Sequence, residues 1–225
     1  MAQKINPTSF RLGVTIPWSS RWFFKKKFNF FIEEDLLIRK LIKEKILVAG
    51  IAAIEIERTN KIIRVSIKAA RPGLIIGRGG KGIEDLKNFL LKNLKKLRKQ
   101  NNQPQDFSLN LSIEELKRSE VSAAVLSQQI AFDIEKRLPY RKIIRRSLEN
   151  LKQNRGVFGA KIKLSGRLNG AEIARQDSLG FGRMPLQTLR ANIDYGEATA
   201  FNTYGTVGIK VWIYKGEIFF ETPRK

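Results

Sequence analysis

The chain of 225 residues contains 43 Lys or Arg against 21 Asp or Glu, which gives a formal net charge of +22 at pH 7. A hydrophobic fraction of 42% is typical of a folded protein, and the excess of positive charge is typical of proteins that bind polyanions. The absence of Cys and His excludes disulfides, thiolate or imidazole metal sites, and catalytic triads built on either side chain.

The composition also argues against membrane insertion and catalysis. No run of about 18 apolar residues is present, and residues 1–6 lack the apolar core of a signal peptide. We expect no membrane partner. We also find no grouping of carboxylates, Lys, Ser or Tyr that would support catalysis, so we expect no enzyme activity, no metal, no cofactor and no small-molecule substrate.

The first 31 residues predict an arm and an aromatic segment. Residues 1–16, interrupted by Pro7, are expected to be an extended arm that presents Lys4 and Arg11. Aromatic residues then lie on both sides of the basic run Lys25–Lys27. They form either a hydrophobic lip of the following domain or a surface that stacks on RNA bases, and we favour the lip for most of them.

The next elements form one α+β domain. Apolar periodicity predicts a helix over residues 32–47, and alternation around Ile54 and Ile63–Ile67 predicts a β-hairpin. A glycine-rich stretch follows at residues 74–82. A second amphipathic helix is predicted over residues 82–99, and a third strand over residues 107–113.

The glycine-rich stretch is the first candidate site. Backbone N–H groups ahead of a helix can hold phosphate, and glycines allow close approach. The candidate contacts are Gly77, Arg78, Gly79, Gly80 and Lys81. The spacing of Gly77, Gly79 and Gly82 also fits a dinucleotide motif, but the hairpin before it and the lack of an acidic residue about 20 positions later argue against that interpretation.

A G-x-x-G loop between two helices is instead typical of KH domains, which bind a few nucleotides of single-stranded nucleic acid through the loop backbone. With a helix in front and the last strand after the loop, the element order is that of a type II KH domain. We place the arm at residues 1–16, the KH domain at 17–118 with its helices on a three-stranded sheet, and a C-terminal α+β domain at 119–225.

The C-terminal domain contains the second candidate site. Helices are predicted over residues 119–137 and 139–153, followed by strands near residues 161–164, 173–175, 189–195 and 207–214, so we expect two helices on a mainly antiparallel four-stranded sheet. The second helix presents Arg141, Lys142, Arg145 and Arg146 with no acid among them. Because like charges so close together repel, these cations are better explained by facing phosphates.

Several segments together resemble the bacterial-type small-subunit ribosomal protein S-three family, and the resemblance covers nearly the whole chain in order. The segments are Gln3–Gly13, Ala70–Gly77, Ser165–Arg175, Gly182–Tyr195, Thr203–Gly205 and Gly208–Gly216. The resemblance implies a KH domain and a C-terminal α+β domain in the head of the small ribosomal subunit, in the cytoplasm or in an organelle with a bacterial-type ribosome.

The resemblance also implies partners and site residues. The partners would be small-subunit rRNA, mRNA, and the small-subunit proteins S-ten and S-fourteen, with S-four and S-five across the channel through which mRNA enters. Arg141, Lys142, Arg145 and Arg146 match the family's mRNA-contacting helix. Candidate rRNA contacts are Lys4, Arg11, Arg167, Arg175, Arg183 and Arg190. Because Gly79 stands where the family commonly has a cation, we expect the loop to contribute less RNA affinity than the helix.

Two other functions remain as alternatives. A free RNA chaperone of the KH type would share the basic charge and the G-x-x-G loop, but it would not travel with small subunits. A dinucleotide-dependent enzyme would bind its cofactor at Gly77–Gly82, with an affinity that does not depend on salt.

Overall fold

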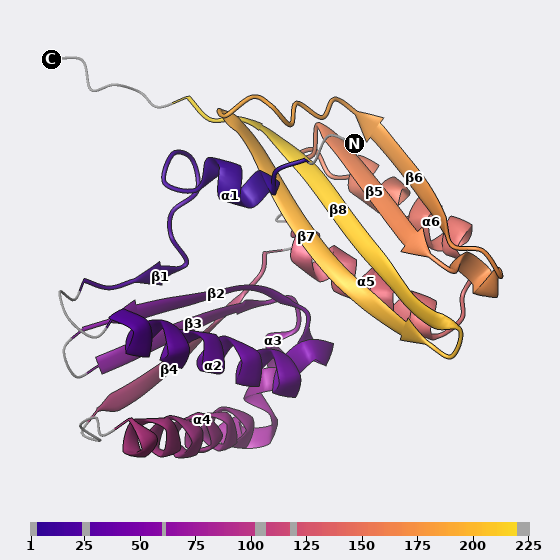
Figure 1. The fold of residues 1–225 in the computed structure, drawn as a ribbon. Helices are drawn as coiled ribbons and strands as arrows, with labels where there is room; N and C mark the ends of the chain where they lie inside the picture. Colours follow the sequence, from indigo (N-terminus) through magenta and orange to yellow (C-terminus); the bar gives the residue numbers. More distant parts are fainter. Residues whose placement is uncertain (1–3, 24–27, 60–61, 102–106, 118–120, 220–225) are drawn as a thin grey trace, which may run out of the picture. The chain divides into compact units, whose positions relative to one another are not determined.

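Two units account for the fold shown in Figure 1: Trp18–Lys117 and a second unit that joins Met1–Pro17 to Arg118–Lys225. The computed structural model describes residues 4–23, 28–59, 62–101, 107–117 and 121–219. The expected boundary at residues 118–119 and the basic run Lys25–Lys27 lie outside these ranges. The N-terminal segment groups with the C-terminal unit.

The unit Trp18–Lys117 is built on a sheet with the strand order β1-β2-β3-β4. The strands are β1 (Ser20–Arg21), β2 (Ile51–Arg58), β3 (Ile62–Ala69) and β4 (Ser108–Glu115). β2 and β3 pair antiparallel, whereas β4 pairs parallel with β3 and β1 pairs parallel with β2. The three predicted strands are therefore present, and the two-residue strand β1 extends the sheet at one edge.

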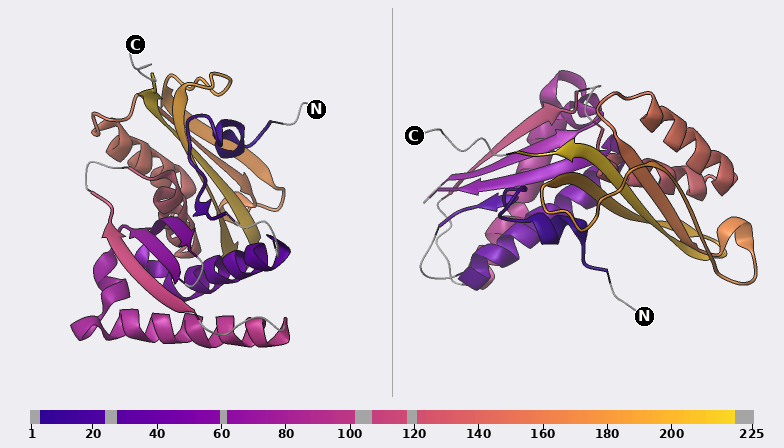
Figure 2. Two further views of the ribbon diagram at one scale, coloured as in Figure 1. Left: turned by 90° about the vertical axis from the view of Figure 1, so that its left-hand side faces the viewer. Right: turned by 90° about the horizontal axis from the view of Figure 1, so that it is seen from above.

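Helices cover one face of this sheet (Figures 1 and 2). They are α2 (Phe28–Ile46), followed by the 3₁₀ turn η1 (Leu47–Ala49), and α4 (Lys81–Gln100). Between β3 and α4 lie the short helix α3 (Pro72–Ile76) and the 3₁₀ turn η2 (Arg78–Gly80). The core contains the apolar face of each helix and the inward side chains of the strands, among them Ile38, Leu90, Ile56 and Val65. This is the expected type II KH order.

A buried ion network ties α2 to the rest of this unit, and the sequence patterns gave no sign of it. The Arg58 guanidinium contacts both Glu34 and Asp35, and Arg98 Nε donates to Glu34 Oε1 at 2.6 Å. Trp22 Nε1 donates to Asp35 Oδ2 at 3.0 Å. Because these carboxylates and guanidiniums balance in charge, they can be buried together between α2, β2 and α4.

The C-terminal unit confirms the predicted architecture of two helices on a four-stranded antiparallel sheet. The helices are α5 (Ala123–Glu135) and α6 (Tyr140–Lys152), and the 3₁₀ turn is η3 (Leu168–Gly170). The strands β5 (Gly159–Gly166), β6 (Arg175–Gly182), β7 (Ala191–Asn202) and β8 (Gly205–Glu217) have the order β6-β5-β8-β7, and all neighbours are antiparallel.

α5 and α6 lie on one face of this sheet, and the N-terminal helix α1 (Pro7–Arg11) lies on the other (Figure 2). The main core joins the helices to alternate strand residues such as Ile162, Ile209 and Val211. The strand predicted over residues 173–175 is wrong, since β6 begins at Arg175 and Ile173 is exposed. The turn η3 and the loop after it occupy the residues before Arg175, so an apolar residue there does not indicate a strand.

The extended arm is also a wrong prediction. Asn6 caps α1 by accepting a hydrogen bond from the backbone N–H of Thr8, and Pro7 occupies the first turn. Asn followed by Pro is a favourable helix start, because Pro has no N–H to leave unpaired there. The helix brings Arg11 against β7 and the segment before it.

Candidate nucleic-acid interface

Helix α6 presents one basic face and buries the other. Arg141, Lys142, Arg145 and Arg146 are all exposed. Their neighbours Ile143, Ile144, Ser147, Leu148 and Leu151 are buried, and the apolar ones belong to the core with α5 and the sheet. The 3.6-residue period therefore places the four cations together on the solvent side of a rigidly packed helix.

The four cations of α6 form no ion pair with any residue that the structure describes. Arg141 Nε instead donates to the Tyr140 hydroxyl at 3.1 Å. This hydrogen bond raises the pKa of Arg141 above its ordinary value, and the charge of Asp177 acts in the same direction. The helix thus presents four exposed cations that form no ion pair with the described residues, which suits a polyanion.

The glycine-rich loop is open to solvent between α3 and α4. Gly77, Gly79 and Gly80 all have positive φ, at 68°, 62° and 79°. Arg78 and Lys81 are exposed beside them. A Cβ atom on Gly79 or Gly80 would meet no atom within 4 Å, so these positions need glycine for the backbone conformation and leave free space above the loop. The predicted loop residues are therefore together and accessible to a phosphate.

The third glycine of the apparent dinucleotide motif has a different role. A Cβ atom on Gly82 would lie 2.5 Å from the carbonyl oxygen of Ile75 and 2.9 Å from that of Ile76. Gly82 is therefore required for the close crossing of α3 and α4. Because internal packing explains this glycine, the spacing of the three glycines no longer points to a cofactor.

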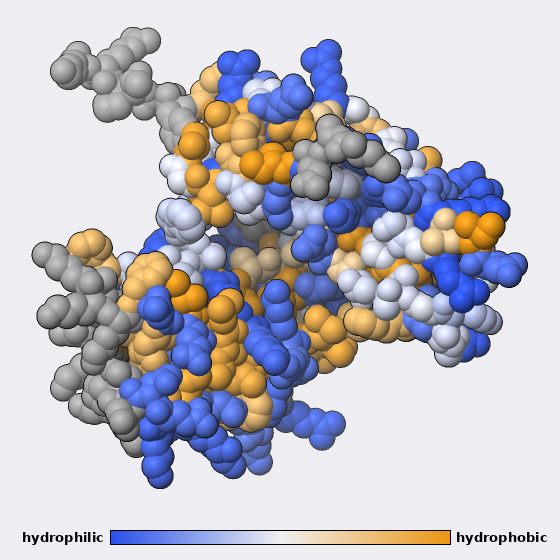
Figure 3. Space-filling model, in the orientation of Figure 1, coloured by the Kyte–Doolittle hydropathy of each residue, from blue (hydrophilic) through white to orange (hydrophobic). Residues whose placement is uncertain are grey.

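Apolar side chains adjoin the loop. Leu74 is 60% exposed and Ile76 is 37% exposed, although Ile75 between them is buried in the core. An exposed apolar surface beside a phosphate-binding backbone is suited to unpaired nucleotides, whose bases are apolar on their faces and whose phosphates are charged. Figure 3 shows a second apolar area along α2, where Phe28, Ile32 and Leu36 are exposed.

Arg11 is not an RNA contact, contrary to our prediction. Its side chain is 0% exposed, and its guanidinium donates to the carbonyl oxygens of Pro7, Leu186, Thr188 and Ala191 at 2.7–3.0 Å. Burial lowers the pKa of Arg11 from its ordinary value. This cation therefore fastens α1 to the C-terminal unit.

The other predicted rRNA contacts differ in the exposure of their side chains and in the partners that these already have. Lys4, Arg175 and Arg183 are exposed. Arg167 is half-buried and donates to the carbonyl oxygens of Ala171 and Tyr204 at 2.8 and 2.9 Å. Its guanidinium therefore joins two turns of the protein. Arg190 is exposed but pairs with Glu217 at 2.6 Å.

Sequence reasoning missed a set of lysines on the sheet face opposite α5 and α6. Ile162, Leu164, Ile209 and Val211 point into the core, so strand alternation directs Lys161, Lys163 and Lys210 to the other face. Lys163 and Lys210 are directly opposite in the β5–β8 ladder. Lys210 also lies opposite Glu197 in the β7–β8 ladder, so Lys163 is the cation of this pair that has no acidic cross-strand neighbour. The alternation of Lys with Ile and Leu in residues 161–164 was the available signal.

Neither a metal site nor a membrane span is found in the part of the chain that the structure describes. No group of acidic side chains in these ranges is arranged to hold a metal ion. None of the described helices has the length and apolar character needed to cross a bilayer. The accessible chemistry of the described surface is that of cations, backbone amides and exposed apolar groups.

Comparisons with known proteins match both units. The family profile described as "KH domain" matches residues 37–121, and the profile described as "Ribosomal protein S3, C-terminal domain" matches residues 130–213. Small ribosomal subunit protein uS3 of Lawsonia intracellularis is 46% identical over 225 residues and is covered over its full length. That of Maridesulfovibrio salexigens is 47% identical over 218 residues, 97% of each chain. That of Solibacter usitatus is 42% identical over 225 residues, and this chain spans 62% of that longer relative.

Proposed function

This chain belongs to the uS3 family of small ribosomal subunit proteins, which are structural components and not enzymes, and from that premise we propose that it binds small-subunit rRNA in the head of the subunit and lines the channel through which mRNA enters. In this role its basic residues assist the passage of structured mRNA during translation.

The exposed cations of α6 are the single observation that best supports an mRNA contact. Arg141, Lys142, Arg145 and Arg146 lie on one side of a helix whose other side is core, so their spacing is fixed before RNA arrives. Guanidinium and ammonium groups held in this way bind phosphates without sequence preference. A channel that must accept every mRNA needs a contact of this kind.

The remaining basic surfaces support rRNA binding. The loop Gly77–Lys81 offers backbone N–H groups and two cations, and the sheet face opposite α5 and α6 offers Lys161, Lys163 and Lys210. Lys4, Arg175 and Arg183 are further exposed contacts in the C-terminal unit. We expect the loop to contribute less affinity than α6, because Gly79 presents no side chain to a phosphate.

The partners and location follow from the same premise. We propose contacts with the small-subunit proteins S-ten and S-fourteen, with S-four and S-five near the mRNA entrance, and a location in cytoplasmic ribosomes or in those of an organelle. A free RNA chaperone of the KH type is the second candidate. Sedimentation of the native protein separates the two, since a chaperone would remain in the free fraction instead of travelling with small subunits.

Crosslinking tests the mRNA contact directly. Small subunits containing this protein are programmed with mRNA that carries 4-thiouridine at successive positions downstream of the decoding site. We expect crosslinks to α6 that fall strongly when Arg141, Lys142 and Arg145 are changed to Ala. A control with Lys87, Lys92 and Lys95 of α4 changed to Ala removes the same charge from another exposed helix face. Equal crosslinking of wild type and the α6 variant would contradict the proposal.

A further inference from the structure

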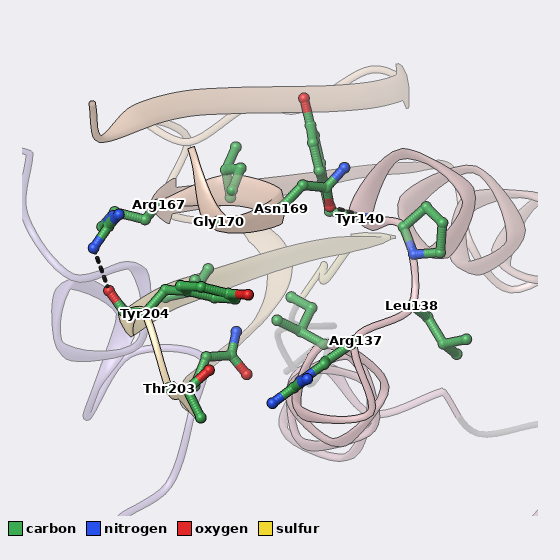
Figure 4. Close-up of a pocket in the computed structure, with 13 residues that line it drawn as sticks. Arg137, Leu138, Tyr140, Arg167, Asn169, Gly170, Thr203 and Tyr204 are labelled. Carbon is green, nitrogen blue, oxygen red and sulfur yellow. Dashed lines mark hydrogen bonds between the residues drawn. The ribbon is translucent and has the colours of Figure 1, made fainter. Parts of the chain in front are cut away.

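A pocket of about 330 Å³ lies in the C-terminal unit where the α5–α6 turn, η3 and the β7–β8 turn meet (Figure 4). Its walls include Arg137, Tyr140, Asn169, Asn202 and Tyr204. Ligand pockets in proteins span about 300–1,000 Å³, so this one is at the small end and suits a single nucleotide. Arg167 is the one candidate rRNA contact named above that lines it.

Backbone strain is concentrated at this pocket. In the described part of the chain, the two non-glycine residues with positive φ are Arg137 at 61° and Asn169 at 55°, and both line it. Asn tolerates this conformation, but Arg does not favour it. Arg137 ends α5 in a Schellman motif, in which its N–H bonds to the carbonyl of Ile134 and that of Leu138 bonds to Asp133. Glycine is the usual residue at that position, because it adopts positive φ without steric cost, so Arg137 is held in a strained conformation.

Hydrogen bonds brace the pocket walls against one another. Arg167 Nη1 donates to the carbonyl oxygen of Tyr204 at 2.9 Å, which joins η3 to the β7–β8 turn. The backbone N–H of Tyr140 donates to Asn169 Oδ1 at 3.4 Å, which joins the start of α6 to η3. Both bonds are drawn in Figure 4. The pocket is therefore built by side chains from three turns and is held open as a unit.

The chemistry of the walls matches a nucleotide. The ring of Tyr204 packs on Gly170, where an added Cβ atom would lie 3.3 Å from it, yet Tyr204 is 52% exposed. An exposed, braced ring is a stacking platform for a base. Asn169 and Asn202 offer amides for base edges. Arg137 is exposed and has no ion pair within the described ranges, so it is available to a phosphate.

We infer that this pocket receives one unpaired RNA nucleotide, with its base on Tyr204 and its phosphate on Arg137. The inference rests on the proposed function, since it assumes that the protein is seated in the small subunit. The pocket adjoins α6, because Tyr140 lines it and also accepts the hydrogen bond of Arg141. An RNA strand bound along α6 could therefore insert a nucleotide here, or rRNA could supply one.

Site-specific photocrosslinking tests the inference. Tyr204 is replaced by p-benzoylphenylalanine in small subunits, and Phe201, which is 72% exposed and lies outside the pocket on β7, is replaced in a matched control. We expect Tyr204→p-benzoylphenylalanine to give one dominant RNA crosslink that the control lacks. A crosslink in subunits without mRNA identifies rRNA as the source, and one that requires mRNA identifies mRNA. A crosslink to protein, or to many nucleotides equally, would overturn the inference.

A second variant keeps the test valid if the bulky residue blocks assembly. Arg137→Gly removes the strained cation, so the Tm of the purified protein should stay equal or rise. In assembled subunits, one nucleotide should become more reactive to a base-specific chemical probe by roughly fivefold or more, the loss expected when one stacked base is released. A lower Tm without a change in any nucleotide would overturn the inference. Failure of wild-type protein to enter small subunits would instead contradict the proposed function.

Discussion

At the residue scale, Arg11 shows how a cation in a strongly basic chain can be structural. We expect Arg11→Met to lower the free energy of unfolding of the C-terminal unit by about 2–4 kcal/mol, because several buried carbonyl oxygens would lose their donor. Chemical denaturation of the purified protein measures this. Lys4→Met is the control and should change stability by less than about 0.5 kcal/mol, since Lys4 is exposed. If the two changes lowered stability equally, Arg11 would not be the residue that holds α1 to the rest of the C-terminal unit.

Gly82 provides the second prediction at this scale. Gly82→Ala should destabilise the unit Trp18–Lys117 by about 1–3 kcal/mol, because the new Cβ would overlap the carbonyl oxygens at the end of α3. Gly73→Ala is the matched control in α3, since a Cβ there would meet no atom within 4 Å and Ala favours a helix. Thermal unfolding measures the Tm of both variants. An equal Tm for Gly82→Ala and Gly73→Ala would show that the crossing of α3 and α4 does not require glycine at position 82.

At the element scale, α2 is held by the buried ion network as well as by apolar packing. Glu34→Gln should destabilise its unit by about 3–5 kcal/mol, because Arg58 and Arg98 would remain buried with too little negative charge. Glu33→Gln changes the neighbouring exposed carboxylate and should have little effect. Urea unfolding of the two variants provides the comparison. A small loss for Glu34→Gln would mean that the network relaxes around a neutral side chain.

The next prediction concerns the face of the C-terminal sheet opposite α5 and α6. If Lys163 and Lys210 contact rRNA phosphates, changing either to Ala should weaken rRNA binding and lower the slope of log affinity against log salt by about 0.7–0.9. Filter binding of a small-subunit rRNA fragment across a salt series measures the slope. Lys40→Ala, an exposed cation on α2, is the control. A slope that stays constant for Lys163→Ala would remove this face from the interface.

The order of the elements could be predicted from sequence because their apolar periods are strong. Helices α4 and α6 and strand β3 each place every buried residue on one face. The strand predicted at 173–175 and the extended arm failed because turn and cap chemistry, not periodicity, decides those segments. The pocket could not be predicted, since its walls come from three turns that are distant in sequence.

At the scale of the whole molecule, the charge of +22 is divided among separate surfaces with separate tasks. The cations of α6 form no ion pairs with the described residues. Arg11, Arg58 and Arg98 are instead buried and bind carbonyl oxygens or carboxylates of the protein. Net charge alone predicts a polyanion partner, but only the fold separates the cations that meet RNA from those that hold the protein together. The proposed mRNA contact therefore depends most on the cations of α6.

The most direct measurement is the rate at which ribosomes pass an mRNA hairpin. Ribosomes carrying Arg141→Ala, Lys142→Ala and Arg145→Ala are compared with wild type and with the α4 control Lys87→Ala, Lys92→Ala and Lys95→Ala, on messages with and without a stable hairpin. We predict that the α6 variant slows only on the structured message, because its assembly and its rate on unstructured mRNA depend on other surfaces. Equal rates through the hairpin for all three kinds of ribosome would contradict the account.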